Sequence, residues 1–320
     1  MKASSPSPFA AAYGGAGWLP RTTSLRQEMG DIWGPWGVAS EWGPLQAVLL
    51  HRPGVEVEGL TDPNAAQMLA PVDPAAMRRE HDALAEAYRR AGVAVHYLEP
   101  STAPPPNTLF VRDLFFTTPE GAILARPAST VRAGEERHVA RRLAELGLPI
   151  LRSVRGNGTF EGADALWVDE KTVLLATGLR TNAEGATQVE SLLREMGVEV
   201  IHVGLPYGAM HLLGVLNFAD RDLAVAWPGQ VPYRAVETVR ERGYEVLWLP
   251  DEAEARQGMA LNFVTLGPRH VLMPAGCPLT RATYEAAGIS CQELEIGELL
   301  KAAGGMACLT GILSRLKDAG

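Results

Sequence analysis

The stretch Val189-Glu-Ser-Leu-Leu-Arg-Glu-Met-Gly197, followed at once by Val-Glu-Val-Ile-His-Val203, decides the fold. A helical pattern ends there at a glycine and continues directly into a short apolar strand. The same pattern occurs five times, with the terminal glycine at 92, 147, 197, 243 and 288, about 50 residues apart. A glycine suits this place because the left-handed backbone after a helix penalises a Cβ. The chain is therefore predicted to consist of five repeating units.

Two strand-like runs joined by a short turn precede four of these helices. They read LFVRDLFFTT–PEG–AILARP, ADALWVD–EK–TVLLATG, GVLNFAD–RD–LAVAW and LNFVTLG–PR–HVLMPA. The first unit has only QAVLLHRP, and CLTGILSR near the C-terminus is expected to supply its missing strand and close a ring. Tight turns make antiparallel pairs, which argues against a plain parallel sheet of βαβ units. We predict an α/β fold of five ββαβ units about a pseudo-fivefold axis, with the inner strands lining a central site.

Composition narrows the classes of function and location. The 320 residues carry a formal net charge of −8 and no Lys/Arg-rich block, so neither nucleic acid nor a membrane surface is an expected partner. No apolar run is long enough to span a bilayer. Three cysteines are too few and odd in number for a disulfide framework, so we expect reduced thiols and a cytoplasmic location. Residues 1–42 are expected to form an irregular N-terminal arm and residues 43–320 a single catalytic domain, and a homodimer stays open.

Four reactive or charged side chains fall near the inner strands of different units. Cys308 follows the pair Gly304-Gly305, His211 opens the fourth unit, Glu161 opens the third with Asp164 close behind, and Asp113 interrupts the apolar run of the second. Each alone has an ordinary structural explanation, such as a small buried thiol or a hydrogen-bonded core histidine. A ring would bring all of them to one central site.

Six short motifs in the same order give the chain a family resemblance. They are NTLFVRD at 107–113, FEGAD at 160–164, GLRTNAEG at 178–185, MHLL at 210–213, ALN at 260–262 and GGMACLT at 304–310. From about residue 42 to 315 the chain resembles the guanidino-group-modifying superfamily of arginine deiminases, dimethylarginine dimethylaminohydrolases and amidinotransferases. The fold of that superfamily is a five-bladed α/β propeller, the pentein fold, which agrees with the repeat read from the sequence.

The resemblance implies a mechanism without metal or cofactor. Asp113 and Glu161 match positions that hold a planar guanidinium, and Cys308 matches the nucleophile that attacks its carbon. His211 would protonate the departing amine and then activate water, leaving a ureido product such as citrulline. Arg132 and Arg180 match positions that approach the α-carboxylate of the small cationic substrate. Asn107 and Asp164 complete the expected binding residues.

Two departures from the family pattern bear on the substrate. Arginine deiminases and amidinotransferases read His-x-Asp, whereas this chain has Leu213 in place of the second acid. An apolar side chain there would suit an N-alkyl group, which favours a substituted arginine such as dimethylarginine. Ala302-Ala303 stand where arginine deiminases carry an arginine, so recognition of the carboxylate is expected to differ.

Several alternatives remain open at this level. They are an arginine deiminase, an amidinotransferase in which an amine replaces water, and a non-catalytic propeller that binds a partner. Residues 53–74, rich in proline, glycine and acids, match a lid in relatives but equally suit an exposed connector. Cys277 and Cys291 have no reactive context, and the remaining histidines lack the spacing of a zinc site.

Overall fold

The computed structural model describes residues 9–316, which form five three-stranded sheets. In each sheet the middle strand is antiparallel to one neighbour and parallel to the other. In order of antiparallel, middle and parallel strand, the sheets are β15 (Gly311–Arg315), β1 (Leu45–Leu50), β2 (Ala94–Tyr97); β3 (Phe115–Thr118), β4 (Gly121–Leu124), β5 (Ile150–Ser153); β6 (Ala165–Asp169), β7 (Thr172–Thr177), β8 (Glu199–Gly204); β9 (Leu216–Asp220), β10 (Leu223–Ala226), β11 (Glu245–Trp248); and β12 (Val264–Gly267), β13 (His270–Pro274), β14 (Ser290–Leu294).

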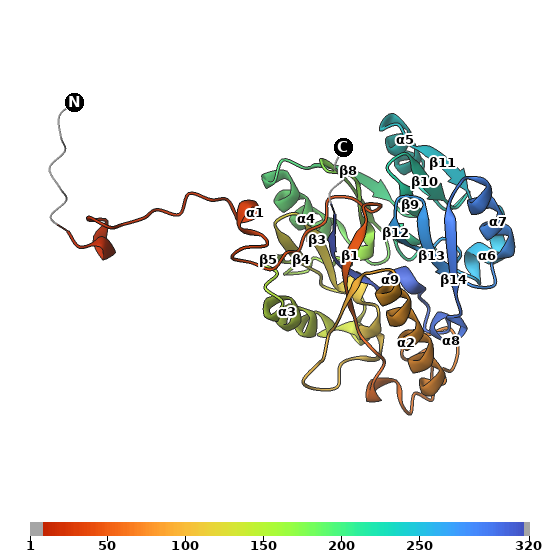
Figure 1. The fold of residues 1–320 in the computed structure, drawn as a ribbon. Coiled ribbons are helices and arrows are strands. Elements are labelled where there is room, and N and C mark those ends of the chain that lie inside the picture. The colour runs from red at the N-terminus through yellow and green to blue at the C-terminus, as the bar shows by residue number, and fades with distance from the viewer. Residues whose placement is uncertain (1–8, 317–320) are drawn as a thin grey trace.

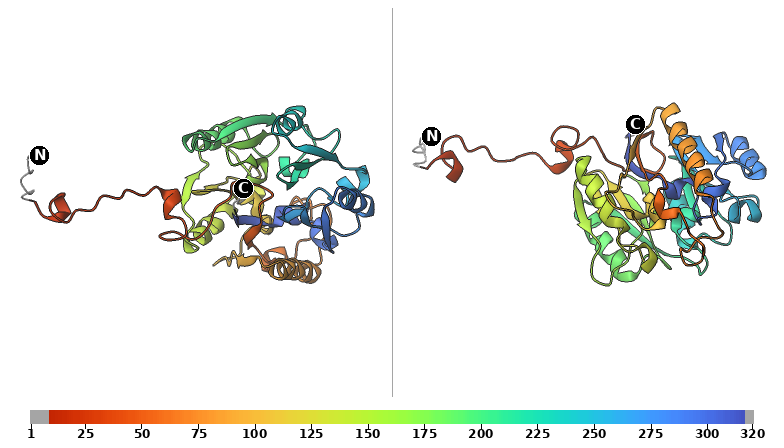
Figure 2. Two further views of the ribbon diagram at one scale, coloured as in Figure 1. Left: turned by 45° about the horizontal axis from the view of Figure 1, so that its top comes forward. Right: turned by 90° about the horizontal axis from the view of Figure 1, so that it is seen from below.

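One helix links the middle strand of each sheet to the parallel strand. The five helices are α2 (Pro74–Arg90), α3 (Glu135–Glu145), α4 (Ala183–Glu195), α5 (Tyr233–Glu241) and α7 (Pro278–Ala286). They lie on the outside of the body (Figure 2). The glycine that follows each of them has φ between 70° and 85°. The five-unit prediction and the reason for its glycines are therefore confirmed.

The predicted pairing across the chain is also confirmed. The C-terminal strand β15 pairs antiparallel with β1, with Ile312 opposite Val48, so the first unit takes its missing strand from the end of the chain. The four remaining hairpins are antiparallel as expected. Figure 1 shows β1 beside the blue C-terminal segment.

The structure differs from the sequence prediction just before four of the five inner strands. The apolar runs were expected to be extended throughout, but short helical turns occupy their first residues. These turns are η4 (Val111–Leu114) before β3, η6 (Gly162–Asp164) before β6, η7 (Leu212–Gly214) before β9 and α9 (Met306–Leu309) before β15. Alternation of side chains between two faces holds only within an extended strand, so it cannot be applied to these residues.

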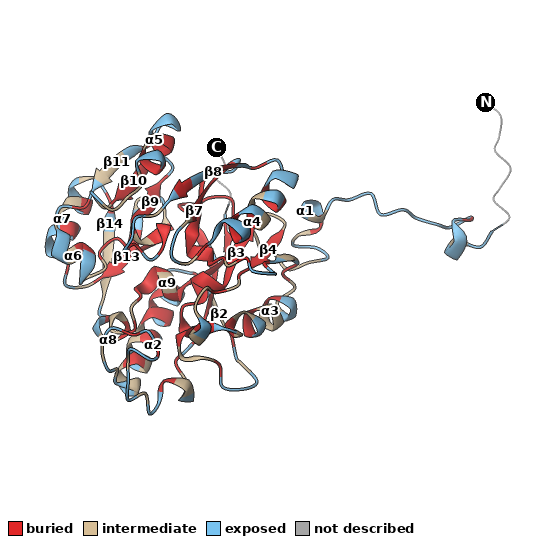
Figure 3. Cartoon of the chain, turned by 180° about the vertical axis from the view of Figure 1, so that it is seen from behind, coloured by how far each residue is buried: buried red, intermediate tan, exposed pale blue. Residues whose placement is uncertain are grey.

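Side chains connect the inner strands of neighbouring sheets. Thr117 of β3 donates to Ile312 O of β15 at 2.6 Å, and Trp167 of β6 donates to Thr117 O at 3.1 Å. Thr265 of β12 donates to Phe218 O of β9 at 2.6 Å. These bonds lie among buried strands, whereas the outer faces of the helices are exposed (Figure 3).

The N-terminal segment divides into two parts. Residues 9–24 extend away from the body (Figure 1) and include the short helix η1 (Ala11–Tyr13). The helix α1 (Leu25–Glu28) follows them. Val38 and Trp42, also expected to belong to the arm, are buried in the main core instead. Residues 1–8 and 317–320, at the two ends of the predicted arm and domain, lie outside the described range.

The remaining short helices are α6 (Glu252–Arg256) and α8 (Gly297–Leu300), with the 3-10 helices η2 (Val55–Val57), η3 (Pro106–Leu109) and η5 (Thr130–Arg132). Within residues 9–316, none of the helices has the length and apolar character that a bilayer crossing demands.

Arg315 offers a test of how the sheets are joined. Its buried guanidinium donates to Gly43 O at 2.6 Å and to Thr265 O at 2.7 Å. Replacing it by methionine leaves both carbonyls without this donor, so R315M is expected to lower the free energy of unfolding by about 2–5 kcal/mol. Urea denaturation measures this value. The exposed Arg234, substituted in the same way, should change it by no more than about 0.5 kcal/mol, and equal effects of the two substitutions would contradict the prediction.

Candidate active site

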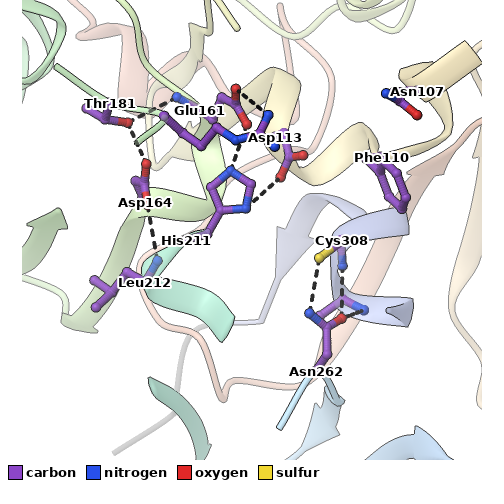
Figure 4. Close-up of polar contacts among 12 residues, drawn as sticks. Asn107, Phe110, Asp113, Glu161, Asp164, Thr181, His211, Leu212, Asn262 and Cys308 are labelled. Carbon is purple, nitrogen blue, oxygen red and sulfur yellow. Dashed lines mark hydrogen bonds and ion pairs between the residues drawn. The ribbon is translucent and has the colours of Figure 1, made fainter. Parts of the chain in front are cut away.

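The short turns before the inner strands carry the polar side chains of the site. Asp113 lies in η4, Glu161 directly precedes η6, His211 directly precedes η7, and Cys308 lies in α9. The turn before β12 adds Asn262, so all five units contribute a residue (Figure 4). The segment just before each inner strand therefore brings one polar group per unit to a common centre.

Cys308 is held by Asn262 and by the two glycines that precede its turn. The Asn262 amide donates to Cys308 Sγ at 3.0 Å, and its oxygen accepts from the backbone N–H groups of Ala307 at 2.8 Å and Cys308 at 3.2 Å. A Cβ on Gly304 would lie 2.2 Å from the Phe110 ring, and one on Gly305 would lie 2.7 Å from Asn262 Oδ1. The glycine pair is therefore required for close approach.

His211 is buried between two carboxylates. Its Nε2 lies 2.7 Å from Glu161 Oε2, and its Nδ1 lies 3.9 Å from Asp113 Oδ1. Burial acts to lower the pKa of His211, but the charges of Asp113 and Asp164 and the hydrogen bond to Glu161 outweigh it and raise the pKa to about 9. The ring is therefore a cation at neutral pH and can serve as a proton donor.

Arg132 is surrounded by three buried carboxylates. Its guanidinium lies 2.7 Å from Asp113, 2.9 Å from Glu135 and 3.3 Å from Glu161. Burial alone would lower the pKa of Arg132, but the three acids hold it well above its usual value. The sequence interpretation assigned Arg132 to the substrate carboxylate, and here it instead neutralises the acids of the site.

Glu161 also differs from its expected position. It is completely buried and binds His211, Arg132 and the backbone N–H of Ala128. Burial acts to raise its pKa, but Arg132 and His211 overcome this and hold the pKa well below the usual range. Glu161 therefore orients His211 from behind, and Asp113 is the carboxylate that faces the cavity.

Burial raises the pKa of the Cys308 thiol to about 11, and the Asp113 carboxylate adds to the increase. Burial raises the pKa values of Cys277 and Cys291 to about 11 as well. Thiol acidity therefore does not single out a nucleophile among the cysteines. All three thiols lie within the described range and are free of disulfides. Position distinguishes Cys308, because it is the cysteine that lines the two cavities described next.

Two cavities meet at Cys308. The first, which we call the polar cavity, has a volume of about 20 Å³, and the second, the apolar chamber, about 270 Å³. The residues common to both are Met210, His211, Ala303, Gly304 and Cys308. The polar cavity is further lined by Gln67, Asn107, Phe110, Asp113, Arg132, Arg180 and Ala302.

Unpaired acceptors face the polar cavity. Asp113 Oδ1 and Asn107 Oδ1 are buried and have no hydrogen-bond partner among residues 9–316. Arg180 makes only a long 3.5 Å contact with Glu161 and retains some exposure. A buried acceptor without a partner is costly, so these atoms indicate a ligand that donates hydrogen bonds.

Besides Glu161, two sequence-predicted residues do not reach either cavity formed by the described chain. Asp164 is buried and accepts from the Thr181 hydroxyl at 2.7 Å and from Leu212 N–H at 3.1 Å, which fixes the backbone beside His211. Burial raises the Asp164 pKa to about 6. Leu213 packs into the main core, because the turn η7 rotates it away from the site. Contrary to expectation, Leu213 is therefore not placed to contact an N-alkyl group.

Sequence reasoning missed Asn262 as a site residue. Its ALN motif was noticed, but no function was assigned to the side chain. The repeat itself contained the signal, since four units each offered a polar residue before the inner strand and the fifth offered Asn262 at the corresponding place.

Asp113, Glu161 and His211 place ligand atoms within 4.8 Å of one another, a spacing that could also hold a metal ion. Arg132 already bridges the two acids, and the raised pKa of His211 keeps both ring nitrogens protonated. A metal would have to displace both cations. The cluster therefore suits an organic cation better than a metal.

The family model for eukaryotic N,N dimethylarginine dimethylhydrolase matches residues 71–306. The chain belongs to this dimethylarginine dimethylaminohydrolase family. A relative of that name from Pseudomonas aeruginosa is 27% identical over 254 residues, covering 79% of this chain and 93% of the relative. An uncharacterized protein of Aeropyrum pernix is 30% identical over 227 residues, covering 70% and 79% respectively.

Solved structures show the same fold. A mutant of the Pseudomonas aeruginosa dimethylarginine dimethylaminohydrolase, complexed with citrulline, superposes with a TM-score of 0.71 at 24% identity. The match covers 85% of this chain and the whole of that one.

The charge state of His211 is directly measurable. By ring-carbon NMR on labelled protein, His211 should titrate with a pKa of about 9, and buried His81, whose pKa desolvation lowers to about 3, should stay neutral. D164N removes one of the charges that raise the His211 pKa and should lower it. Because that pKa lies above the unfolded value, the stability it contributes is full below about pH 6.5 and is lost as the pH rises through about 9. A His211 pKa at or below 6.5 in the native protein would contradict this assignment.

Proposed function

We propose that this protein is a cysteine-dependent hydrolase of guanidino compounds, of the dimethylarginine dimethylaminohydrolase type, with Cys308 as the nucleophile and His211 as the acid and base. One observation carries the proposal: Cys308, His211 and Asp113, whose Oδ1 makes no hydrogen bond among residues 9–316, line one cavity. A thiol, a protonated imidazole and a free carboxylate are the groups that attack on a guanidinium carbon requires.

Asp113 supplies the recognition of charge. Its Oδ2 is bound to Arg132, while Oδ1 remains free to accept from a guanidinium N–H. Among the described residues of the site, four acids (Asp113, Glu135, Glu161 and Asp164) surround three cations (Arg132, Arg180 and His211). The balance is negative, although burial raises the Glu135 pKa to about 7 and so weakens the excess. Such a site attracts a single positive charge.

Substrate binding also activates the thiol. Asp113 is one of the groups that raise the Cys308 pKa. A guanidinium bound to Asp113 neutralises that charge and places a cation beside the sulfur, and both effects lower the thiol pKa. Asn262, which donates to Sγ, stabilises the thiolate that results after the proton leaves to solvent.

The reaction then proceeds in two halves. The Cys308 thiolate adds to the guanidinium carbon, and the tetrahedral species expels an amine that takes a proton from His211. A thiouronium remains on Cys308. Neutral His211 next removes a proton from water as the water adds to the same carbon. The carbon–sulfur bond then breaks, giving the ureido product, the Cys308 thiol and protonated His211.

The amino-acid end of the substrate lies in the polar cavity. Arg180 is the cation best placed for an α-carboxylate, because Arg132 is saturated by three acids. Asn107 Oδ1 is a free acceptor for an α-ammonium, since the Asn107 amide nitrogen already donates to Ala66 O at 2.7 Å. Gln67 places the predicted lid beside this cavity, and motion of the lid stays a prediction.

We further infer that the five sheets close into the propeller and that residues from about 37 onward form its single domain. Bonds between neighbouring inner strands support closure, and Arg315 of β15 bonds to Thr265 O of β12, while Tyr244, which precedes β11, bonds to Val168 O of β6. The cytoplasmic location rests on three free thiols and stays a prediction, as does a homodimer.

Two alternatives from the family resemblance are separated by assay. An amidinotransferase would pass the amidino group from Cys308 to an added amine, and an arginine deiminase would release ammonia from unsubstituted arginine. Neither is favoured by a particular contact of the described residues. Dimethylarginine is incubated with the protein, and the ureido product and dimethylamine are measured. Formation of both compounds without an added amine supports the hydrolase.

Covalent chemistry at Cys308 is the first test. C308S should lower kcat by roughly 10³-fold or more, because a hydroxyl is a much weaker nucleophile than a thiolate. A slowly hydrolysed amidine should add mass to the peptide that contains Cys308. The control C291S, at a half-buried thiol outside both cavities of the described chain, should retain activity. Added mass on a peptide that contains another cysteine instead would show that the nucleophile is not Cys308.

The pH dependence is the second test. Turnover needs a Cys308 thiolate together with a protonated His211, whose pKa values in the free protein are about 11 and about 9. The profile of kcat/KM, which reports the free enzyme, should therefore be bell-shaped with its optimum near pH 10. The optimum of kcat should lie at lower pH than that of kcat/KM, because the optimum lies midway between the two pKa values and bound substrate lowers the thiol pKa. Identical optima for kcat and kcat/KM would exclude activation by the substrate.

A further inference from the structure

The apolar chamber is larger than the groups that the proposed function requires. Its volume of about 270 Å³ exceeds the roughly 150 Å³ of an apolar cavity that is known to hold benzene. Its walls include Leu69, Met210, Val215, Trp227, Met259 and Leu261. Two methyl groups would fill only a small part of this space.

The catalytic groups open into this chamber. Both Cys308 and His211 line it as well as the polar cavity. The departing nitrogen must be bonded to the carbon on Cys308 and must accept a proton from His211. It therefore lies at the junction of the two cavities. Asp113 and Arg180 occupy the polar side, so a substituent on that nitrogen extends into the apolar chamber.

Two polar side chains of the chamber, Asn262 and Arg256, already have partners within the chain. The Asn262 side chain bonds to Cys308 Sγ and to two backbone N–H groups. Arg256 pairs with Glu252 at 2.8 Å and lies over the Trp227 ring at 5.2 Å. The amino-acid end of a substrate is better matched by the polar cavity, where Arg180 and the Asn107 acceptor lie.

The aromatic wall is fixed before any ligand binds. Trp227 Nε1 donates to Glu252 Oε2 at 2.8 Å, and Arg256 covers the ring on one side. A preformed apolar surface gains affinity for an apolar group without a cost for ordering the side chain. Leu69, from the predicted lid, and Met210 are partly exposed apolar side chains of the same chamber.

We propose that the apolar chamber receives the N-substituent of the guanidine, and that this enzyme hydrolyses guanidines whose departing amine carries an apolar group larger than methyl, up to a benzyl group. This inference rests on the proposed function and names its substrate class. The sequence alone predicted that Leu213 contacts the N-substituent. The chamber assigns this contact instead to nearby residues, among them Met210 and Val215. Hydrolysis of such a substrate gives the same ureido product and a primary amine such as benzylamine.

Gly214 allows the chamber to be filled without disturbing the fold. It lines the chamber, its φ is not positive, and a Cβ built on it meets nothing within 4 Å. Gly204, at the end of β8, has the same open surroundings and does not line the chamber of the described chain. G214L and G204L therefore form a matched pair, in which only the first adds a side chain to the chamber.

The test compares kcat/KM for dimethylarginine, N-benzylarginine and unsubstituted arginine, with ureido product and released amine both measured. Wild type should hydrolyse N-benzylarginine at least as efficiently as dimethylarginine. G214L should reduce the value for N-benzylarginine by tenfold or more and change that for arginine by less than about threefold. G204L should change neither.

The outcomes separate the two proposals. Efficient hydrolysis of dimethylarginine with a hundredfold lower kcat/KM for N-benzylarginine would overturn the chamber assignment alone. Equal losses for all substrates in G214L would also overturn it, because the added side chain would then act on catalysis in general. Absence of ureido product from every compound would overturn the hydrolase proposal itself.

Discussion

Pairing of Arg132 with Asp113, Glu135 and Glu161 is the interaction on which the rest of the site depends. Three buried carboxylates without a counter-ion would repel one another and lose most of their hydration. Arg132 bonds to all three, at distances between 2.7 and 3.3 Å. It thereby keeps Glu161 ionised beneath His211, and a charged Glu161 helps to keep His211 protonated. Through Glu161, Arg132 thus helps to set the charge of His211.

The same pairing explains why Asp113 is left half satisfied. One carboxylate oxygen binds Arg132, and the other makes no hydrogen bond within residues 9–316 and lies 3.9 Å from His211 Nδ1. The carboxylate therefore contacts an internal guanidinium on one side and lines the polar cavity on the other. Because Asp113 also raises the Cys308 pKa, recognition of charge and activation of the thiol depend on a single carboxyl group.

The sequence predicted the architecture well because the repeat has a local physical cause. Each glycine after a helix adopts the left-handed conformation, and each tight turn makes an antiparallel pair. The pairing of β15 with β1 was also foreseen, since the first unit lacked a strand. The turns before the inner strands were not foreseen, because a short apolar run does not distinguish a strand from a helical turn. Leu213 was misplaced for this reason. Pairing of Arg132 with Asp113 and Glu161 depends on tertiary contacts that no local pattern contains.

Pairing of β1 with β15 has a consequence for how the protein is made. Residues 45–50 leave the ribosome long before residues 311–315, so the first sheet waits for nearly the whole chain before its edge is covered. Cys308 directly precedes that last strand, and Asn262 positions its sulfur only when the strand has docked. Until then β1 presents an unpaired edge that invites aggregation. A nascent chain without residues 311–315 therefore lacks the docked strand next to the turn that places the Cys308 thiol beside Asn262.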